Sequence, residues 1–160
     1  MKMSGGVEWA LHCCVVLTGA TEPVPAARLA AFHDVSPTYL AKQLQALSRA
    51  GLVRSVQGQA GGYQLTRDPQ AITVLDVVEA VDGRQSAFVC TEIRQRGPFA
   101  ATPEQCRVPC GIASVMYDAD RAWRDSLRAT TIADLAGRVG RDVGPETLPR
   151  AREWMAGRSG

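Results

Sequence analysis

The segment from Ser36 to Thr66 constrains the fold of this chain more than any other stretch of its 160 residues. It begins as an amphipathic helix, for which Ser36 is a suitable N-cap, Pro37 suits the first turn and Gly51 is a C-terminal stop. Leucines recur on one face of this helix, at Leu40, Leu44 and Leu47. The sequence therefore predicts a helix with a buried leucine face and a polar outer face that ends at Ala50.

The hydrophobic period then changes from that of a helix to that of strands. Leu52–Val56 and Tyr63–Thr66 are predicted as two strands, which the glycine-rich stretch 57–62 joins. A shorter helix is predicted from Pro25 to Ala30, and His33–Ser36 forms the turn before the longer helix. Two helices in this order, followed by a glycine-tipped hairpin, predict a winged helix-turn-helix, and helix-turn-helix elements commonly bind DNA.

The rest of the chain adds helices, so we expect a mainly α protein with a small β-hairpin wing. Val7–Leu17 is predicted as a partly buried first helix, and Thr73–Asp76 as the cap of a helix that ends at Gly83. Gly111–Ala129 is the longest predicted helix, and its apolar stripe favours pairing with a second copy, because little chain is left to cover it. The predicted organisation is a winged helix-turn-helix domain in residues 1–83, a cysteine-bearing loop in 84–110, a dimerisation helix with a short following helix in 111–139, and a flexible tail in 140–160.

Charge is distributed unevenly over the predicted DNA-binding element. From Val35 to Arg67 the chain has four basic residues and no Asp or Glu, although the net charge of the whole protein is only +2. A basic, polar face of this kind suits contacts with phosphates and base edges. The predicted DNA contacts are Ser36, Thr38, Tyr39, Lys42, Gln43, Arg49, Gln57, Gly58 and Gly61. The alternative is a winged helix that serves only protein contacts.

Composition and missing motifs argue against several classes of protein. The apolar stretch 11–17 is too short for a secretory signal, and no stretch approaches the roughly 20 apolar residues of a membrane span. Five cysteines, an odd number, without an export signal favour the reducing cytoplasm. No Ser-His-Asp order, phosphate-binding loop or pair of carboxylates stands out, so we expect neither an enzyme nor a small-molecule substrate.

Three cysteines, Cys90, Cys106 and Cys110, lie in a loop whose glycines and prolines prevent regular structure, whereas Cys13 and Cys14 are predicted to be core. Thiolates can hold an iron–sulfur cluster, hold zinc or form a redox couple. Zinc sites prefer cysteines about two to four residues apart, which only Cys106 and Cys110 approach. The loop supplies at most three of the four protein ligands of a 2Fe–2S cluster. The residues alone leave open a metal centre with a further ligand, a thiol switch, and cysteines without metal.

The wing carries a resemblance to a known family. Gly51–Arg67, with Gly61-Gly62-Tyr63 inside it, lies between Ser36–Leu44 and Ile72–Val81 in the order found in the winged-helix regulators typified by IscR and the nitric-oxide sensor NsrR. The chain resembles this family from about Val7 to Arg128. The resemblance implies a homodimer held by a long C-terminal helix, a palindromic operator in double-stranded DNA, and in many members an iron–sulfur cluster in the cysteine loop.

The sequence departs from the family pattern in two places. Gln57 stands in the wing where the family usually carries Arg, and the cysteines are more widely spaced than in the compact arrangement of the family. Resemblance to a redox-sensing member implies mixed ligation of a 2Fe–2S cluster by Cys90, Cys110, His33 and Glu8, with the carboxylate from the partner subunit in some members. From the residues alone, Cys106 is the more obvious ligand, and it stays the alternative.

We therefore expect a DNA-binding transcription regulator, a repressor, that senses redox state through a 2Fe–2S cluster. One alternative is a cluster-free regulator that is switched by a disulfide between Cys106 and Cys110, or by one that involves Cys90. The other is a winged-helix DNA-binding protein that zinc stabilises. Because His33 precedes the predicted DNA-reading helix, a metal bond to it would link the state of the cluster to DNA binding.

Overall fold

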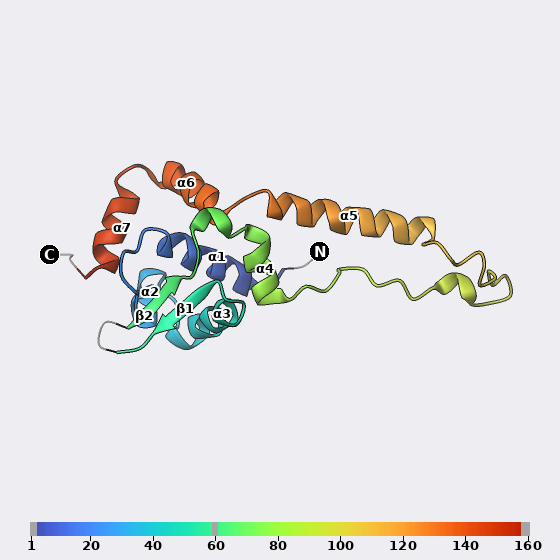
Figure 1. The fold of residues 1–160 in the computed structure, drawn as a ribbon, viewed down its shortest axis with the longest axis horizontal. Coiled ribbons are helices and arrows are strands. Elements are labelled where there is room, and N and C mark those ends of the chain that lie inside the picture. Colours follow the sequence, from blue (N-terminus) through green and yellow to red (C-terminus); the bar gives the residue numbers. More distant parts are fainter. Residues whose placement is uncertain (1–2, 59–60, 158–160) are drawn as a thin grey trace. The chain divides into compact units, whose positions relative to one another are not determined.

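The computed structural model describes residues 3–58 and 61–157, and the chain divides into two compact units. The loop unit is Gln85–Ser126, and the winged-helix unit contains the residues up to Arg84 together with those from Leu127 onward. The winged-helix unit contains α1 (Gly5–Leu17), α2 (Ala26–Phe32), α3 (Pro37–Arg49), β1 (Val53–Val56), β2 (Gly62–Leu65), the 3-10 turn η1 (Pro69–Ala71), α4 (Val74–Asp82), α6 (Ile132–Val143) and α7 (Thr147–Met155) (Figure 1).

The core of the winged-helix unit forms where α1, α3 and α4 pack together. The three leucines of α3, at positions 40, 44 and 47, are fully buried, as their spacing predicts. Each contributes about 2 kcal/mol by leaving water. Cys13 and Cys14 of α1 lie in the same cluster, which confirms that they are core residues. Burial raises the pKa of Cys13 to about 12 and raises that of Cys14 as well, so both thiols stay protonated and unreactive.

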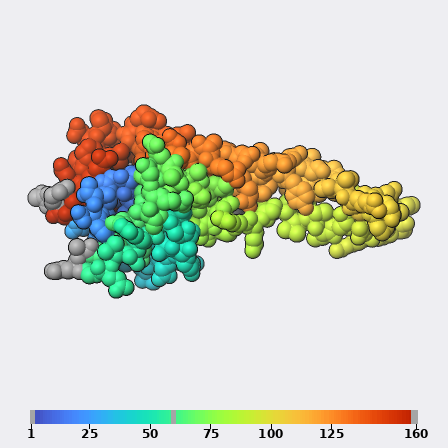
Figure 2. Space-filling model, viewed as in Figure 1, coloured from blue at the N-terminus to red at the C-terminus, as the bar shows by residue number. Residues whose placement is uncertain are grey.

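The wing is an antiparallel hairpin of β1 and β2, in which Val53 lies opposite Leu65. The chain just before α2 extends it by one residue, because Val24 and Tyr63 exchange backbone hydrogen bonds of 2.9 and 2.8 Å. Gly62 permits this close approach, since a Cβ there would overlap the backbone of Val24. In Figure 2 the segments of α3 and the wing lie together on one side of the winged-helix unit. The structure confirms a mainly helical fold with a small hairpin wing.

The α4 and α6 helices begin side by side. The predicted cap of α4 is confirmed, because Thr73 and Asp76 exchange side-chain-to-backbone hydrogen bonds of 2.8 and 3.1 Å. The α6 helix has the same kind of cap, and at its start the Ile132 N–H donates to the Ile72 carbonyl at 2.8 Å. Ile132 is fully buried in the core. The structure thus assigns α6 to the winged-helix unit, which differs from the predicted grouping of 111–139 into one segment.

A flexible tail is predicted for 140–160, but its described part, 140–157, contains the end of α6 and the packed helix α7, while 158–160 lie outside the described residues. The α6 helix continues to Val143, and α7 then places Met155 in the core of the winged-helix unit. Arg28 of α2 donates hydrogen bonds to the carbonyls of Trp154 and Met155, at 3.1 and 3.0 Å. A positive group at the C-terminal end of a helix is favoured by the helix dipole. The composition of this segment predicts flexibility because α7 depends on contacts with distant parts of the chain, which composition does not record.

The loop unit contains the short turn η2 (Ile93–Gln95) and most of α5 (Gly111–Arg128). Residues 84–110 have no regular element longer than η2, as their glycines and prolines predict. Within α5, which the structure describes in full, only Ala113 is buried, whereas Ile112 is 74% exposed and Val115 67% exposed. The N-terminal part of the apolar stripe that favours pairing with a second copy is therefore exposed in the single chain, whereas Trp123 and Leu127 farther along it are half-buried. Among the described helices, none combines the length and the apolar character that a membrane span requires.

Candidate nucleic-acid interface and cysteine loop

The turn between α2 and α3 sets the direction in which α3 leaves the core. His33 is the C-cap residue of α2, and Asp34 adopts a left-handed backbone conformation with φ of 49°. The Val35 N–H donates to the Ala30 carbonyl at 3.0 Å, which closes the end of α2. Asp is one of the few residues other than glycine that accepts such a conformation readily. His33 thus lies in the turn that connects α2 to α3.

The outer face of α3 presents most of the residues predicted to contact DNA. The exposed residues from this set are Ser36, Thr38, Tyr39, Lys42 and Arg49. Ser36 is the N-cap but its side chain makes no capping hydrogen bond. Its hydroxyl can therefore donate to a phosphate at the helix N-terminus, where anions are favoured. Since α3 carries Lys42 and Arg49 but no acid, this face can meet a DNA backbone without charge repulsion.

Gln43 does not belong to this face, and its prediction as a DNA contact was wrong. Its side chain is buried at 5% exposure, and the amide packs against α1, where a Cβ on Gly6 would lie 2.6 Å from the Gln43 Oε1 atom. Position 43 follows Leu40 by three residues and precedes Leu47 by four, which places it on the leucine face of the helix. Residue type suggested an outward side chain, but the helical period decides the face.

The wing presents its predicted residues at the end of the hairpin. Gln57 and Gly58 are exposed and Gly61 is half-buried. Gly58 has a φ of 109°, and its carbonyl accepts a hydrogen bond of 2.9 Å from the Gly61 N–H, so both glycines serve the shape of the turn. The structure adds Arg54, which is exposed on β1. The signal for it was present in the sequence, because it is one of the basic residues of the acid-free segment.

His33 lies among aromatic rings. Its imidazole makes edge contacts with Phe32, His12 and Trp9, with ring centroids 4.9, 5.6 and 6.0 Å away. Its Nε2 atom is buried and has no hydrogen-bond partner among the described residues. Burial, followed by the neighbouring His12, lowers the pKa of His33, so the ring favours the neutral form that binds metals. A buried polar atom that has lost its hydrogen bond with water usually has another partner. A bound metal would be such a partner for the Nε2 atom of His33.

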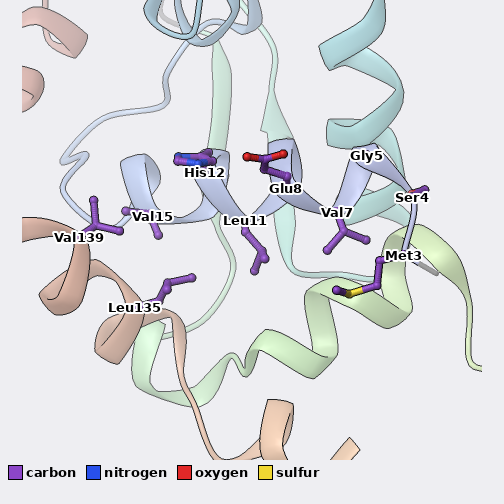
Figure 3. Close-up of a pocket in the computed structure, with 10 residues that line it drawn as sticks. All are labelled: Met3, Ser4, Gly5, Val7, Glu8, Leu11, His12, Val15, Leu135 and Val139. Atoms are coloured by element: carbon purple, nitrogen blue, oxygen red, sulfur yellow. The ribbon is translucent and has the colours of Figure 1, made fainter. Parts of the chain in front are cut away.

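Glu8 is exposed on α1, beside an apolar groove of about 450 Å³ between α1 and α6. Figure 3 shows Glu8 and His12 next to each other on α1, one helical turn apart, with Leu11 turned toward Leu135 of α6. The carboxylate is therefore accessible from outside the chain. An exposed carboxylate at this position is compatible with coordination of a cluster that a second copy of the chain holds.

The three cysteines of the loop unit are each half-buried and free of disulfides. Cys110 directly precedes α5, and its sulfur accepts a hydrogen bond from the Ala113 N–H at 3.4 Å. This contact holds the Cys110 side chain against the first turn of α5. Cys90 and Cys106 are held in the same unit. All three are therefore accessible thiols, in contrast to the buried pair in α1.

The predicted metal ligands are divided between the two units. Cys90 and Cys110 belong to the loop unit, while Glu8 and His33 belong to the winged-helix unit. Within one chain, no three His, Cys, Asp or Glu side chains of the described residues are grouped so that they could hold a metal ion. The donor types nevertheless fit an iron–sulfur cluster with mixed ligands, since the set contains soft thiol donors and an imidazole nitrogen that has no hydrogen-bond partner among the described residues.

Comparison with known proteins places most of the chain in one family. Residues 3–138 match the family model Rrf2, described as an iron-dependent transcriptional regulator. The candidate HTH-type transcriptional regulator YwgB of Bacillus subtilis is 31% identical over 144 residues, which cover 88% of this chain and 87% of that protein. The HTH-type transcriptional regulator IscR of Klebsiella pneumoniae is 40% identical over 76 residues, which cover 48% of this chain and 47% of IscR.

A solved structure shows the same architecture. The structure of CymR, the global cysteine regulator of B. subtilis, aligns with a TM-score of 0.67 at 26% sequence identity. The alignment covers 86% of this chain and 98% of that chain. The α7 helix lies beyond the residues that the family model matches.

Proposed function

Because this chain belongs to the Rrf2 family of DNA-binding transcriptional regulators, we propose that it is a homodimeric repressor that senses redox state through a bound 2Fe–2S cluster. Each subunit places α3 in a major groove of a palindromic operator, with the wing beside the backbone. The half-sites then lie about one helical turn apart, roughly 10 bp. The exposed apolar residues in the first half of α5, such as Ile112 and Val115, support pairing of two copies.

Lys42→Ala is expected to weaken operator binding about tenfold, because it removes an exposed positive charge from the outer face of α3. The slope of log affinity against log salt should also fall by about one, since one phosphate contact is lost. Fluorescence anisotropy with labelled operator DNA at several salt concentrations measures both.

The matched control is Arg150→Ala, which removes the same charge from the exposed surface of α7. It should leave affinity and salt slope unchanged. Equal losses in the two variants would mean that net charge, and not the face of α3, governs binding.

The proposed cluster ligands are Cys90, Cys110, His33 and Glu8, with Cys106 as the alternative to one of them. The unpartnered, buried Nε2 atom of His33 is the observation that carries this proposal. A bound 2Fe–2S cluster supplies a reversible one-electron couple. His33 would transmit its state, because this residue ends α2 and lies three positions before the N-cap of α3. A shift of the imidazole would move the turn that aims α3, and a change of a few kcal/mol in DNA affinity is enough for a switch.

The direct test is purification of the protein without oxygen. Protein that carries the cluster is coloured, contains iron and acid-labile sulfide in equal amounts, and loses much of its visible absorption when it is reduced. Colourless protein without iron would contradict the cluster, and stoichiometric zinc in its place would favour the zinc-stabilised alternative.

A cluster-free thiol switch is the second candidate. Cys106 and Cys110 are both accessible, and the Arg94 side chain lies close enough to both for their thiolate charges to raise its pKa further, beyond the larger effect of Glu92. In that case colourless protein should form a Cys106–Cys110 disulfide on treatment with peroxide, which peptide mass analysis detects.

A further inference from the structure

Arg94 stands at the centre of the hydrogen bonds that hold the cysteine loop. Its guanidinium donates to the Gln105 carbonyl at 3.4 Å and to the Val108 carbonyl at 2.9 Å. It also grips both carboxylate oxygens of Glu92, at 2.6 and 3.1 Å. Its own carbonyl accepts a hydrogen bond of 2.7 Å from the Ala101 N–H. One residue thus joins the first part of the loop to the part that carries the last two cysteines.

The carbonyls that Arg94 reaches lie beside those cysteines. Gln105 precedes Cys106 directly, and Val108 lies two residues before Cys110. The pKa of Arg94 is raised, first by its hydrogen bond with Glu92 and also by the thiolate charges of Cys106 and Cys110. Because the guanidinium bonds to the carbonyls of Gln105 and Val108, a permanent positive charge lies against the backbone that flanks Cys106 and precedes Cys110.

Glu92 depends on this arrangement as well. It adopts a left-handed backbone conformation with φ of 52°, which side-chain-bearing residues rarely accept. Arg94 bonds to both oxygens of the Glu92 carboxylate, so the two side chains form a bidentate ion pair. A residue keeps a strained backbone conformation only where its surroundings hold it there. The bidentate ion pair with Arg94 is such a restraint on Glu92.

We propose that Arg94 is the positioning residue of the cysteine loop, and that its charge favours the reduced, more negative state of the cluster bound there. The charge effect rests on the proposed function, whereas the positioning effect does not. Reduction adds one electron from an external donor, such as a mediator dye, and makes the cluster more negative by one unit. A fixed positive charge nearby stabilises that state more than the oxidised one. Arg94 itself gains and loses no proton, because its pKa lies far above any working pH.

The first experiment uses the full chain without the cluster. Hydrogen exchange of the amides of Ala101 and Cys106, which are bonded within the loop, should be roughly tenfold faster in Arg94→Ala than in the unaltered protein, because charged hydrogen bonds are lost. Arg94→Lys keeps the charge but not the planar fork, so exchange should rise there too. Arg96→Ala removes an exposed arginine from the same loop and should change nothing. Unchanged exchange in Arg94→Ala would overturn the positioning role.

The second experiment titrates cluster-loaded protein with mediator dyes. At one applied potential, the ratio of reduced to oxidised cluster should fall roughly tenfold in Arg94→Ala, and much less in Arg94→Lys, which retains the charge. Arg96→Ala should match the unaltered protein. An unchanged ratio in Arg94→Ala would overturn the charge effect. Failure of Arg94→Ala alone to take up a cluster supports positioning. A lack of cluster in every variant contradicts the proposed function, and the exchange experiment then still decides whether Arg94 positions the loop.

Discussion

His33→Ala is expected to abolish binding of the 2Fe–2S cluster. The substitution removes the one buried side-chain nitrogen that has no hydrogen-bond partner among the described residues, which is the proposed ligand from the winged-helix unit. Protein purified without oxygen should then lose its visible absorption and its iron. Operator affinity should no longer respond to reduction, since the link between cluster and turn is lost.

Two control variants separate ligation from packing. His12→Ala removes the neighbouring imidazole, 5.6 Å from that of His33, and should keep the cluster. Cys106→Ala should keep it as well, whereas Cys90→Ala and Cys110→Ala should lose it. Urea unfolding checks that each variant is folded. Retention of the cluster by His33→Ala together with its loss in Cys106→Ala would reverse the assignment of the fourth ligand.

Gly62→Ala is expected to destabilise the protein by about 3 kcal/mol, because the new Cβ would overlap backbone atoms that cannot move independently. The overlapping atoms are the carbonyl carbon and oxygen of Val24, in the residue that pairs with Tyr63. The wing must shift away from the chain before α2. Operator affinity should fall with it, since the wing is then misplaced relative to α3. Urea denaturation and anisotropy with operator DNA measure the two effects.

Gly111→Ala is the matched control for this change. A Cβ at Gly111 would meet no atom within 4 Å, and the position begins α5, where alanine favours the helix. Its stability should therefore be unchanged or slightly higher. Equal stability of Gly62→Ala and the unaltered protein would mean that the pairing of Val24 with Tyr63 does not hold the wing.

Much of the DNA-reading element could be predicted because its signals are local. The leucine spacing, the proline and glycine at its ends and the glycines of the hairpin each depend on residues a few positions apart. Gln43 is the exception, and it shows the limit of arguing from residue type. Its residue type favours the outer face, but its position in the helical period places it on the leucine face and the packing against Gly6 buries it.

The candidate metal site was less accessible to sequence reasoning. The loop cysteines are visible as residues, but their number and spacing leave the remaining ligands open. Glu8 and His33 came from family resemblance, and no pattern in their neighbourhood identifies them. The unpartnered Nε2 atom of His33 becomes apparent only when the rings of Trp9, His12 and Phe32 are placed around it.

The sequence by itself determined the winged helix-turn-helix, its order of elements and the irregular cysteine loop, because hydrophobic period, caps and turn residues act over a few positions. Only the tertiary structure decided that α6 and α7 belong to the winged-helix unit and that Arg94 ties the cysteine loop together. Composition predicts a flexible tail over 140–160, yet Arg28 and the core around Met155 hold α7 in place. Such contacts join residues far apart in the chain, so no local pattern records them.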